Sequence, residues 1–244
     1  MLNETKPAPT TLVTFLLDRT GSMQSIKDDT IGAFNAYLST LKKDPAGIEF
    51  SFLQFDSISL DKVCVNTPVG AVAPLTEATF QPRASTPLID AAYATIEAVG
   101  EAIGKRGIAP QVVICIQTDG HENASTEHTW DELNLLIREK SKLGWQFNFM
   151  GAGIDAYQQA RQMGIPAAAT VSYDKMSAKA SMRAFEASAE NTVRFARMEM
   201  DELVFSLDQK IEAGDVYAEP RDPPGGPSSW KGTSRRPLVE KLTL

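Results

Sequence analysis

Three short segments of the sequence concentrate side chains whose oxygen atoms can bind a metal ion. They are residues 18–23, 84–88 and 118–123, here called the first, second and third metal segments. Asp18 and Asp119 supply carboxylates, and Thr20, Ser22 and Thr86 supply hydroxyl groups. Mg²⁺ and Mn²⁺ prefer oxygen ligands in octahedral geometry and keep several bound waters. The five side chains therefore form a candidate site for a divalent cation, with Mg²⁺ as the first expectation and Mn²⁺ or Ca²⁺ as alternatives.

The mixture of ligand types has a consequence for what such a site does. Hydroxyl ligands bind a cation without neutralising it, so positive charge remains to attract a carboxylate from another molecule. The spacing of Asp18, Thr20 and Ser22 requires a sharp turn if all three side chains are to converge, and Gly21 permits that turn.

The elements that must position these residues follow from the hydrophobic pattern. Continuous apolar runs predict buried strands, and apolar residues spaced by three and four predict amphipathic helices. The expected strands are residues 11–17, 48–55, 57–66, 111–117, 145–150 and, weakly, 167–171. The expected helices are residues 31–41, 89–103, 130–137, 156–163 and 182–196.

Alternation of strands and helices predicts an α/β fold of the doubly wound, Rossmann-like type. We expect a mostly parallel six-stranded sheet with helices on both faces. Residues 48–66 are expected to form a hairpin, which supplies one antiparallel edge strand. In such a sheet ligands bind at the carboxyl ends of the strands, where the three oxygen-rich segments lie.

Outside these elements the sequence predicts less regular structure. Residues 67–87 read as a long loop with one short helical turn near Val72, and residues 1–10 as a flexible lead. We assign residues 11–200 to one domain and residues 201–244 to a C-terminal extension, which contains the Pro- and Gly-rich segment 219–237. Trp230, in that segment, is expected to dock onto the domain.

The three segments together resemble a known family. Asp18-Arg19-Thr20-Gly21-Ser22 resembles the Asp-x-Ser/Thr-x-Ser signature of the metal-ion-dependent adhesion site of von Willebrand factor A domains, and Met23 continues its common form. Thr86 resembles the family's second-loop threonine, and Asp119 its third-loop aspartate. The resemblance covers roughly residues 10–200. It implies an intracellular bacterial or phage member that binds a divalent cation and a protein partner, whose acidic residue completes the coordination.

Four residues of the first and third metal segments are candidates for contact with that partner: Arg19, Met23, His121 and Glu122. Arg19 is either a solvated charge or a contact to an acidic partner. Glu122 and Asn123 shape either the loop or the partner surface. His121 and His128 are seven residues apart without a matching third ligand, which argues against zinc.

Composition narrows the remaining possibilities. The net charge of -7 disfavours nucleic acid and anionic membranes as partners. Neither an apolar signal region nor a membrane-length apolar run is present, so we expect a cytoplasmic protein. Cys64 and Cys115 both lie in expected strands and are predicted to be buried and reduced.

Three functions are compatible with these residues. The first is a metal-dependent protein-binding scaffold or adaptor, which is not an enzyme. The second is a structural component of a larger assembly, such as a phage particle or a complex with an AAA+ ATPase. The third is a metal-dependent phosphohydrolase. It is disfavoured because Thr20 replaces the second aspartate of the Asp-x-Asp pair that haloacid dehalogenase-type phosphatases use.

Overall fold

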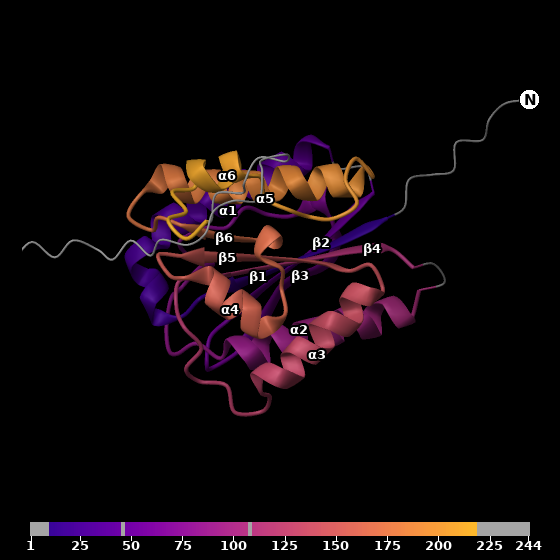
Figure 1. The fold of residues 1–244 in the computed structure, drawn as a ribbon, viewed down its shortest axis with the longest axis horizontal. Helices are drawn as coiled ribbons and strands as arrows, with labels where there is room; N and C mark the ends of the chain where they lie inside the picture. The colour runs from indigo at the N-terminus through magenta and orange to yellow at the C-terminus, as the bar shows by residue number, and fades with distance from the viewer. Residues whose placement is uncertain (1–9, 45–46, 107–108, 219–244) are drawn as a thin grey trace, which may run out of the picture.

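The fold is built around one six-stranded sheet, seen in a computed structural model that describes residues 10–44, 47–106 and 109–218. The strand order is β3-β2-β1-β4-β5-β6 (Figure 1). The strands are β1 (Thr11–Asp18), β2 (Ile48–Phe55), β3 (Leu60–Pro68), β4 (Gln111–Thr118), β5 (Gln146–Ala152) and β6 (Thr170–Tyr173).

Strand β1 lies at the centre and is buried along its whole length. It pairs in parallel with β2 on one side and with β4 on the other. Strands β4, β5 and β6 continue the parallel arrangement, whereas β3 pairs antiparallel with β2. The predicted fold class, a mostly parallel sheet with one antiparallel edge strand, is therefore confirmed.

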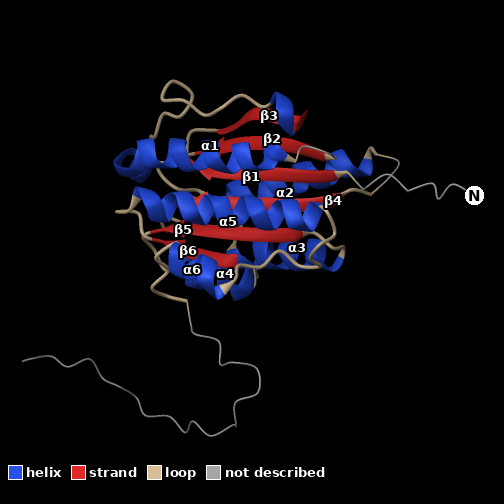
Figure 2. Cartoon of the chain, turned by 90° about the horizontal axis from the view of Figure 1, so that it is seen from above, coloured by secondary structure: helices blue, strands red, loops and turns tan. Residues whose placement is uncertain are grey.

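Helices cover both faces of the sheet (Figures 1 and 2). One face carries α1 (Lys27–Lys43), α5 (Ala178–Ala196) and the short α6 (Leu207–Glu212); the other carries α2 (Leu88–Gly104), α3 (Trp130–Lys142) and α4 (Ala156–Met163). Because side chains alternate along a strand, each strand feeds both layers. In β1, for example, Phe15 belongs to the core under α1 and α5, and Leu16 belongs to the core over α2.

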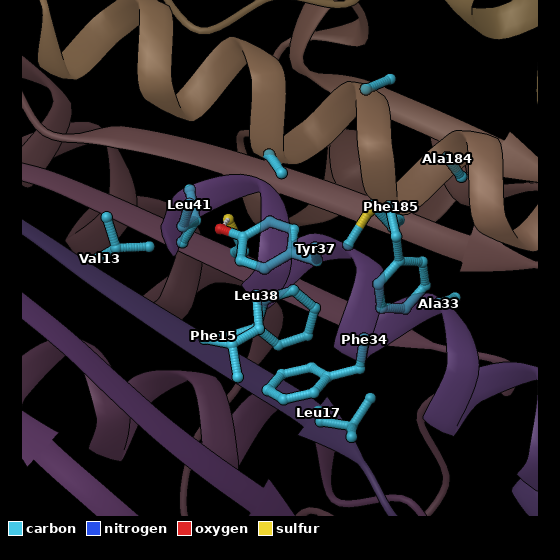
Figure 3. Packing of buried hydrophobic residues seen from close by; sticks show 14 of the residues in the cluster. Val13, Phe15, Leu17, Ala33, Phe34, Tyr37, Leu38, Leu41, Ala184 and Phe185 are labelled. Carbon is cyan, nitrogen blue, oxygen red and sulfur yellow. Dashed lines mark hydrogen bonds between the residues drawn. The ribbon is translucent and has the colours of Figure 1, made fainter. Parts of the chain in front are cut away.

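Aromatic packing fills the core between the sheet and the α1–α5 layer (Figure 3). The ring of Phe15 meets Phe34 edge-on at 5.3 Å and Tyr37 at 4.9 Å between centroids. It also stacks on Phe185 of α5 at 5.8 Å. These contacts join β1, α1 and α5, and they fix the strand whose carboxyl end bears Asp18.

The C-terminal end of the described chain packs more closely than the sequence predicts. Leu203, Phe205 and Ala213 are buried in the same core as α1 and α5. The backbone N–H of Phe205 also donates to the carbonyl of Ala168 at 2.8 Å. Packing thus continues past residue 200, where we expected the domain to end. Residues 1–9 and 219–244, with the expected docking of Trp230, lie outside the described residues.

Smaller differences between the expected and the observed helices and strands lie at their ends. The expected helical turn near Val72 is a 3-10 turn, η2 (Val69–Ala71). Residues 167–169, expected to begin a strand, form another 3-10 turn, η3 (Ala167–Ala169), which the hydrogen bond from the Ala169 N–H to the Pro166 carbonyl closes at 2.9 Å. Both cysteines are free thiols, but only Cys115 is fully buried; Cys64 is half-buried because β3 is an edge strand.

Candidate metal-binding site

The five predicted ligands converge at the carboxyl ends of β1 and β4. Asp18 is the last residue of β1, and Asp119 directly follows β4. The hydroxyl oxygens of Thr20 and Ser22 lie 3.2 Å apart, and that of Thr86 lies 3.2 Å from Thr20. The Ser22 hydroxyl donates to Oδ1 of Asp119 at 2.5 Å. Side chains from three distant segments thus form one continuous cluster of oxygen atoms.

Asp18 supplies charge and also shapes the turn. Its carboxylate is fully buried and accepts hydrogen bonds from the Thr20 N–H at 2.6 Å and from the Thr118 hydroxyl at 2.5 Å. Burial raises the pKa of Asp18 to about 6, although these hydrogen bonds oppose the rise. The arrangement therefore holds a carboxylate where its ionised form is costly unless a cation is near.

Asp119 has a carboxylate oxygen that is available to bind a cation. Its residue is 4% exposed, and Oδ2 is buried without a hydrogen-bond partner among the described residues. Burial raises the pKa of Asp119, while the Ser22 hydrogen bond and the charge of Lys175 act in the opposite direction. A buried carboxylate oxygen without a partner is unfavourable, and a divalent cation would satisfy it. The oxygen cluster thus fits a hard cation.

Two glycines lie directly against the ligand cluster. A Cβ at Gly120 would lie 3.4 Å from the Thr86 hydroxyl and 3.7 Å from the Ser22 hydroxyl, in van der Waals contact with two of the ligands. A Cβ at Gly21 would lie 3.3 Å from the carbonyl of Ala84, which accepts the Gly21 N–H at 3.0 Å. This close approach joins the first and second metal segments.

Arg19 and Met23, two of the predicted partner-contact residues, are both buried in this structure. Met23 is 0% exposed because the 3-10 helix η1 (Gly21–Ile26) turns its side chain into the core. Arg19 is 7% exposed and forms ion pairs with Asp56 and Asp61, each at 2.7 Å. It is therefore neither a solvated charge nor free to contact another protein, and this corrects both interpretations of its role.

Glu122 shapes its own loop. One carboxylate oxygen accepts from the N–H groups of Ala124 and Ser125, and the other accepts from the Ser125 hydroxyl and the Ile89 N–H. These bonds tie the third metal segment to the first turn of α2, so its carboxylate is fully used within the chain. His121, in contrast, is exposed beside Asp119 and remains a candidate for partner contact.

The expectation that the chain binds no zinc stays a prediction. In the described part of the chain, no three or more His, Cys, Asp or Glu side chains form a group that could hold a metal ion. His128 stacks on Tyr93 at 3.7 Å between ring centroids, which gives it a packing role. The candidate site contains only two side chains of these four types, Asp18 and Asp119, and its other ligands are hydroxyls. It is therefore compatible with the lack of a larger cluster among the described residues.

Sequence reasoning missed two groups that support the site. Thr118, the last residue of β4, fixes Asp18. Asp56, in the β2–β3 turn, accepts hydrogen bonds from Arg19 and Arg83 at 2.7 and 2.9 Å. Burial raises the pKa of Asp56, but the bonds from Arg83, from the Ile58 N–H and from Arg19 outweigh it and hold that pKa below its usual range. The sequence signal was weak, since Asp56 looks like an ordinary turn residue.

Comparison with solved structures identifies the fold. The chain matches a von Willebrand factor type A protein from Catenulispora acidiphila with a TM-score of 0.53 and 16% identity, over 75% of this chain and 43% of that one. It matches the pilus adhesin SpaC from Lactobacillus rhamnosus GG with a TM-score of 0.57 and 11% identity, over 79% and 31%. It also matches manganese-loaded TRAP protein from Plasmodium vivax with a TM-score of 0.50 and 13% identity, over 74% and 75%.

The chain therefore has the fold of von Willebrand factor A domains, and it spans less than half the length of the first two structures. No protein-family profile and no curated protein sequence matches it. Among the described helices, none combines the length and the apolar character needed to cross a lipid bilayer.

Proposed function

We propose that this chain is a von Willebrand factor A domain that binds a protein partner through a divalent cation. The observation that carries the proposal is the convergence of five oxygen-bearing side chains, among them Asp119, whose buried Oδ2 has no partner among the described residues. The residues that would hold the ion are Asp18, Thr20, Ser22, Thr86 and Asp119.

The donor set favours Mg²⁺, with Mn²⁺ or Ca²⁺ as alternatives. A bound divalent cation with mostly neutral ligands supplies a positive coordination position that an outside Asp or Glu side chain can occupy. The known structures support this use of the fold, because SpaC is a pilus adhesin and TRAP was crystallised with manganese. The exposed His121 beside Asp119 is the partner-contact residue that we retain.

A catalytic role is less well supported by the same geometry. Thr20 stands two residues after Asp18, where a haloacid dehalogenase-type phosphohydrolase carries its second aspartate. Thr20 cannot replace a carboxylic acid as proton donor. We therefore propose a binding module and not an enzyme.

Calorimetric titration with Mg²⁺ tests the proposal directly. The wild-type chain should bind one ion, and Asp119→Ala should bind none while keeping its circular-dichroism spectrum. Asp208→Ala is the matched control, because Asp208 is exposed on α6, far in sequence from the site. Unchanged Mg²⁺ affinity in Asp119→Ala would overturn the metal assignment.

A further inference from the structure

We propose that Arg19, Asp56 and Arg83, here called the arginine network, position the hydroxyl ligands of the metal site. The inference rests on the proposed function and deepens it, because it assigns the residues that preorganise the site without touching the ion. Asp56 lies in the turn between β2 and β3, and its side chain is 0% exposed.

Asp56 organises three segments at once. Its Oδ1 accepts from the N–H groups of Ile58 and Ser59 at 2.7 and 3.0 Å, which fixes the hairpin turn. Its Oδ2 accepts from Nε and Nη2 of Arg19 at 3.0 and 2.7 Å, and from Nε of Arg83 at 2.9 Å. One carboxylate thus holds both guanidinium groups, with charge-assisted hydrogen bonds that are stronger than neutral ones.

The two arginines lie directly beside the ligands. Arg19 stands between Asp18 and Thr20, and Arg83 is three residues before Thr86. Backbone bonds complete the connection, because the Arg83 N–H donates to the Arg19 carbonyl at 2.9 Å and the Gly21 N–H donates to the Ala84 carbonyl at 3.0 Å. A shift of either arginine would therefore move the Thr20 and Thr86 hydroxyls relative to each other.

The second segment also carries backbone strain that needs such support. Ala84 has a φ of 60°, in the left-handed region that side-chain-bearing residues rarely adopt. On its other side, the Ser57 N–H donates to the Ser85 carbonyl at 2.9 Å, and the Ser57 hydroxyl accepts from the Ser85 N–H at 3.1 Å. The hairpin turn and the arginine network together hold Ala84 in this conformation and so place Thr86.

We choose Arg83 for substitution because its side chain is 45% exposed, so the chain should still fold without it. Removing Asp56 would instead leave the nearly buried Arg19 guanidinium without its main partner, which is strongly destabilising. Arg106→Gln is the matched control. Arg106 forms a comparable, partly exposed ion pair with Glu49 at the opposite end of β2, where that strand begins.

The first measurement is Mg²⁺ affinity by calorimetry on the full chain. We expect Arg83→Gln to weaken binding by about 10- to 100-fold, as for other outer-shell partners of metal ligands. Arg106→Gln should stay within about twofold of wild type, the scale on which an exposed ion pair matters. Arg83→Lys, which keeps the charge but loses the planar guanidinium, should recover only part of the affinity. Equal affinities for Arg83→Gln and wild type would overturn the inference, as would equal losses in both glutamine variants.

A second measurement does not depend on metal. In metal-free protein, amide hydrogen exchange at Gly21 and Ser57 should accelerate in Arg83→Gln and remain unchanged in Arg106→Gln. If the wild type binds no Mg²⁺, the proposed function fails. Accelerated exchange would then still support the role of the network in ordering these segments, whereas unchanged exchange in Arg83→Gln would overturn that role too.

Discussion

The hydroxyl of Ser22 donates to Oδ1 of Asp119 at 2.5 Å, although the two residues are 97 positions apart in the chain. This bond closes the oxygen cluster between the ends of β1 and β4. It uses one oxygen of Asp119 and leaves the other, Oδ2, buried without a partner in the described structure. A site with one satisfied and one unsatisfied carboxylate oxygen is organised before any cation arrives, and the consequences can be measured.

Asp18 should make the metal-free protein less stable as the pH rises. Its pKa is raised from 3.8 to about 6, so between these values the unfolded chain ionises first and folding becomes less favourable. This difference in pKa lowers the unfolding free energy by roughly 3 kcal/mol above pH 6, and the loss vanishes below pH 4, where the carboxyl group is protonated in both states. In EDTA, Asp18→Asn should therefore gain unfolding free energy relative to wild type as the pH increases from 4 to 6.

Denaturant titrations across this pH range check the Asp18 prediction. The same titrations with saturating Mg²⁺ supply the control. The ionised carboxylate of the wild type should bind the ion, and the uncharged side chain of the variant should not. There the advantage of Asp18→Asn should shrink or reverse. A constant difference between variant and wild type from pH 4 to pH 7 would contradict the burial argument.

Thr86 should contribute through its hydroxyl and not through its methyl group. Thr86 is 3% exposed, and its hydroxyl lies 3.2 Å from that of Thr20. We expect Thr86→Ala to weaken Mg²⁺ binding by at least about tenfold, since even outer-shell changes cost 10- to 100-fold. Thr86→Ser keeps the hydroxyl and should bind within a few-fold of wild type. Similar calorimetric affinities for the serine and alanine variants would exclude Thr86 as a ligand.

Phe205 should be part of the folded core despite its place beyond residue 200. It is 2% exposed and packs in the core under α1 and α5. We expect Phe205→Ala to lower the unfolding free energy by about 3 to 5 kcal/mol, the usual cost of deleting a buried aromatic ring. Leu207→Ala, two residues further on and 36% exposed, should cost much less. Equal losses in the two variants by urea denaturation would show that burial does not distinguish these positions.

Partner capture should depend on the cation. Because the proposed ion offers a coordination position to an outside carboxylate, the immobilised chain should retain a partner from host lysate in Mg²⁺ and release it in EDTA. Asp119→Ala should fail to capture the same protein in either buffer. Capture that is equally strong in EDTA, or by Asp119→Ala, would place the contact away from the metal site.

The sequence was sufficient to predict the central strands of the sheet, because strong local patterns mark them. The apolar run that ends at Leu17 and the β-branched run that ends at Gln117 predict buried strands, and the polar residues that follow them then lie at one edge of the sheet. The spacing of Asp18, Thr20 and Ser22 around Gly21 likewise depends on local turn geometry alone. The α/β class and the candidate ligand set therefore followed from short segments read one at a time.

Only the tertiary structure decided which neighbouring side chains face solvent and which support the site. Arg19 and Met23 lie in the same turn as the ligands, yet their burial depends on Asp56 and on the core, which belong to other segments. Packing of Phe205 against distant helices likewise leaves no periodic signal in its own segment. Such contacts join residues far apart in the chain, so their energies depend on the folded arrangement and not on local sequence.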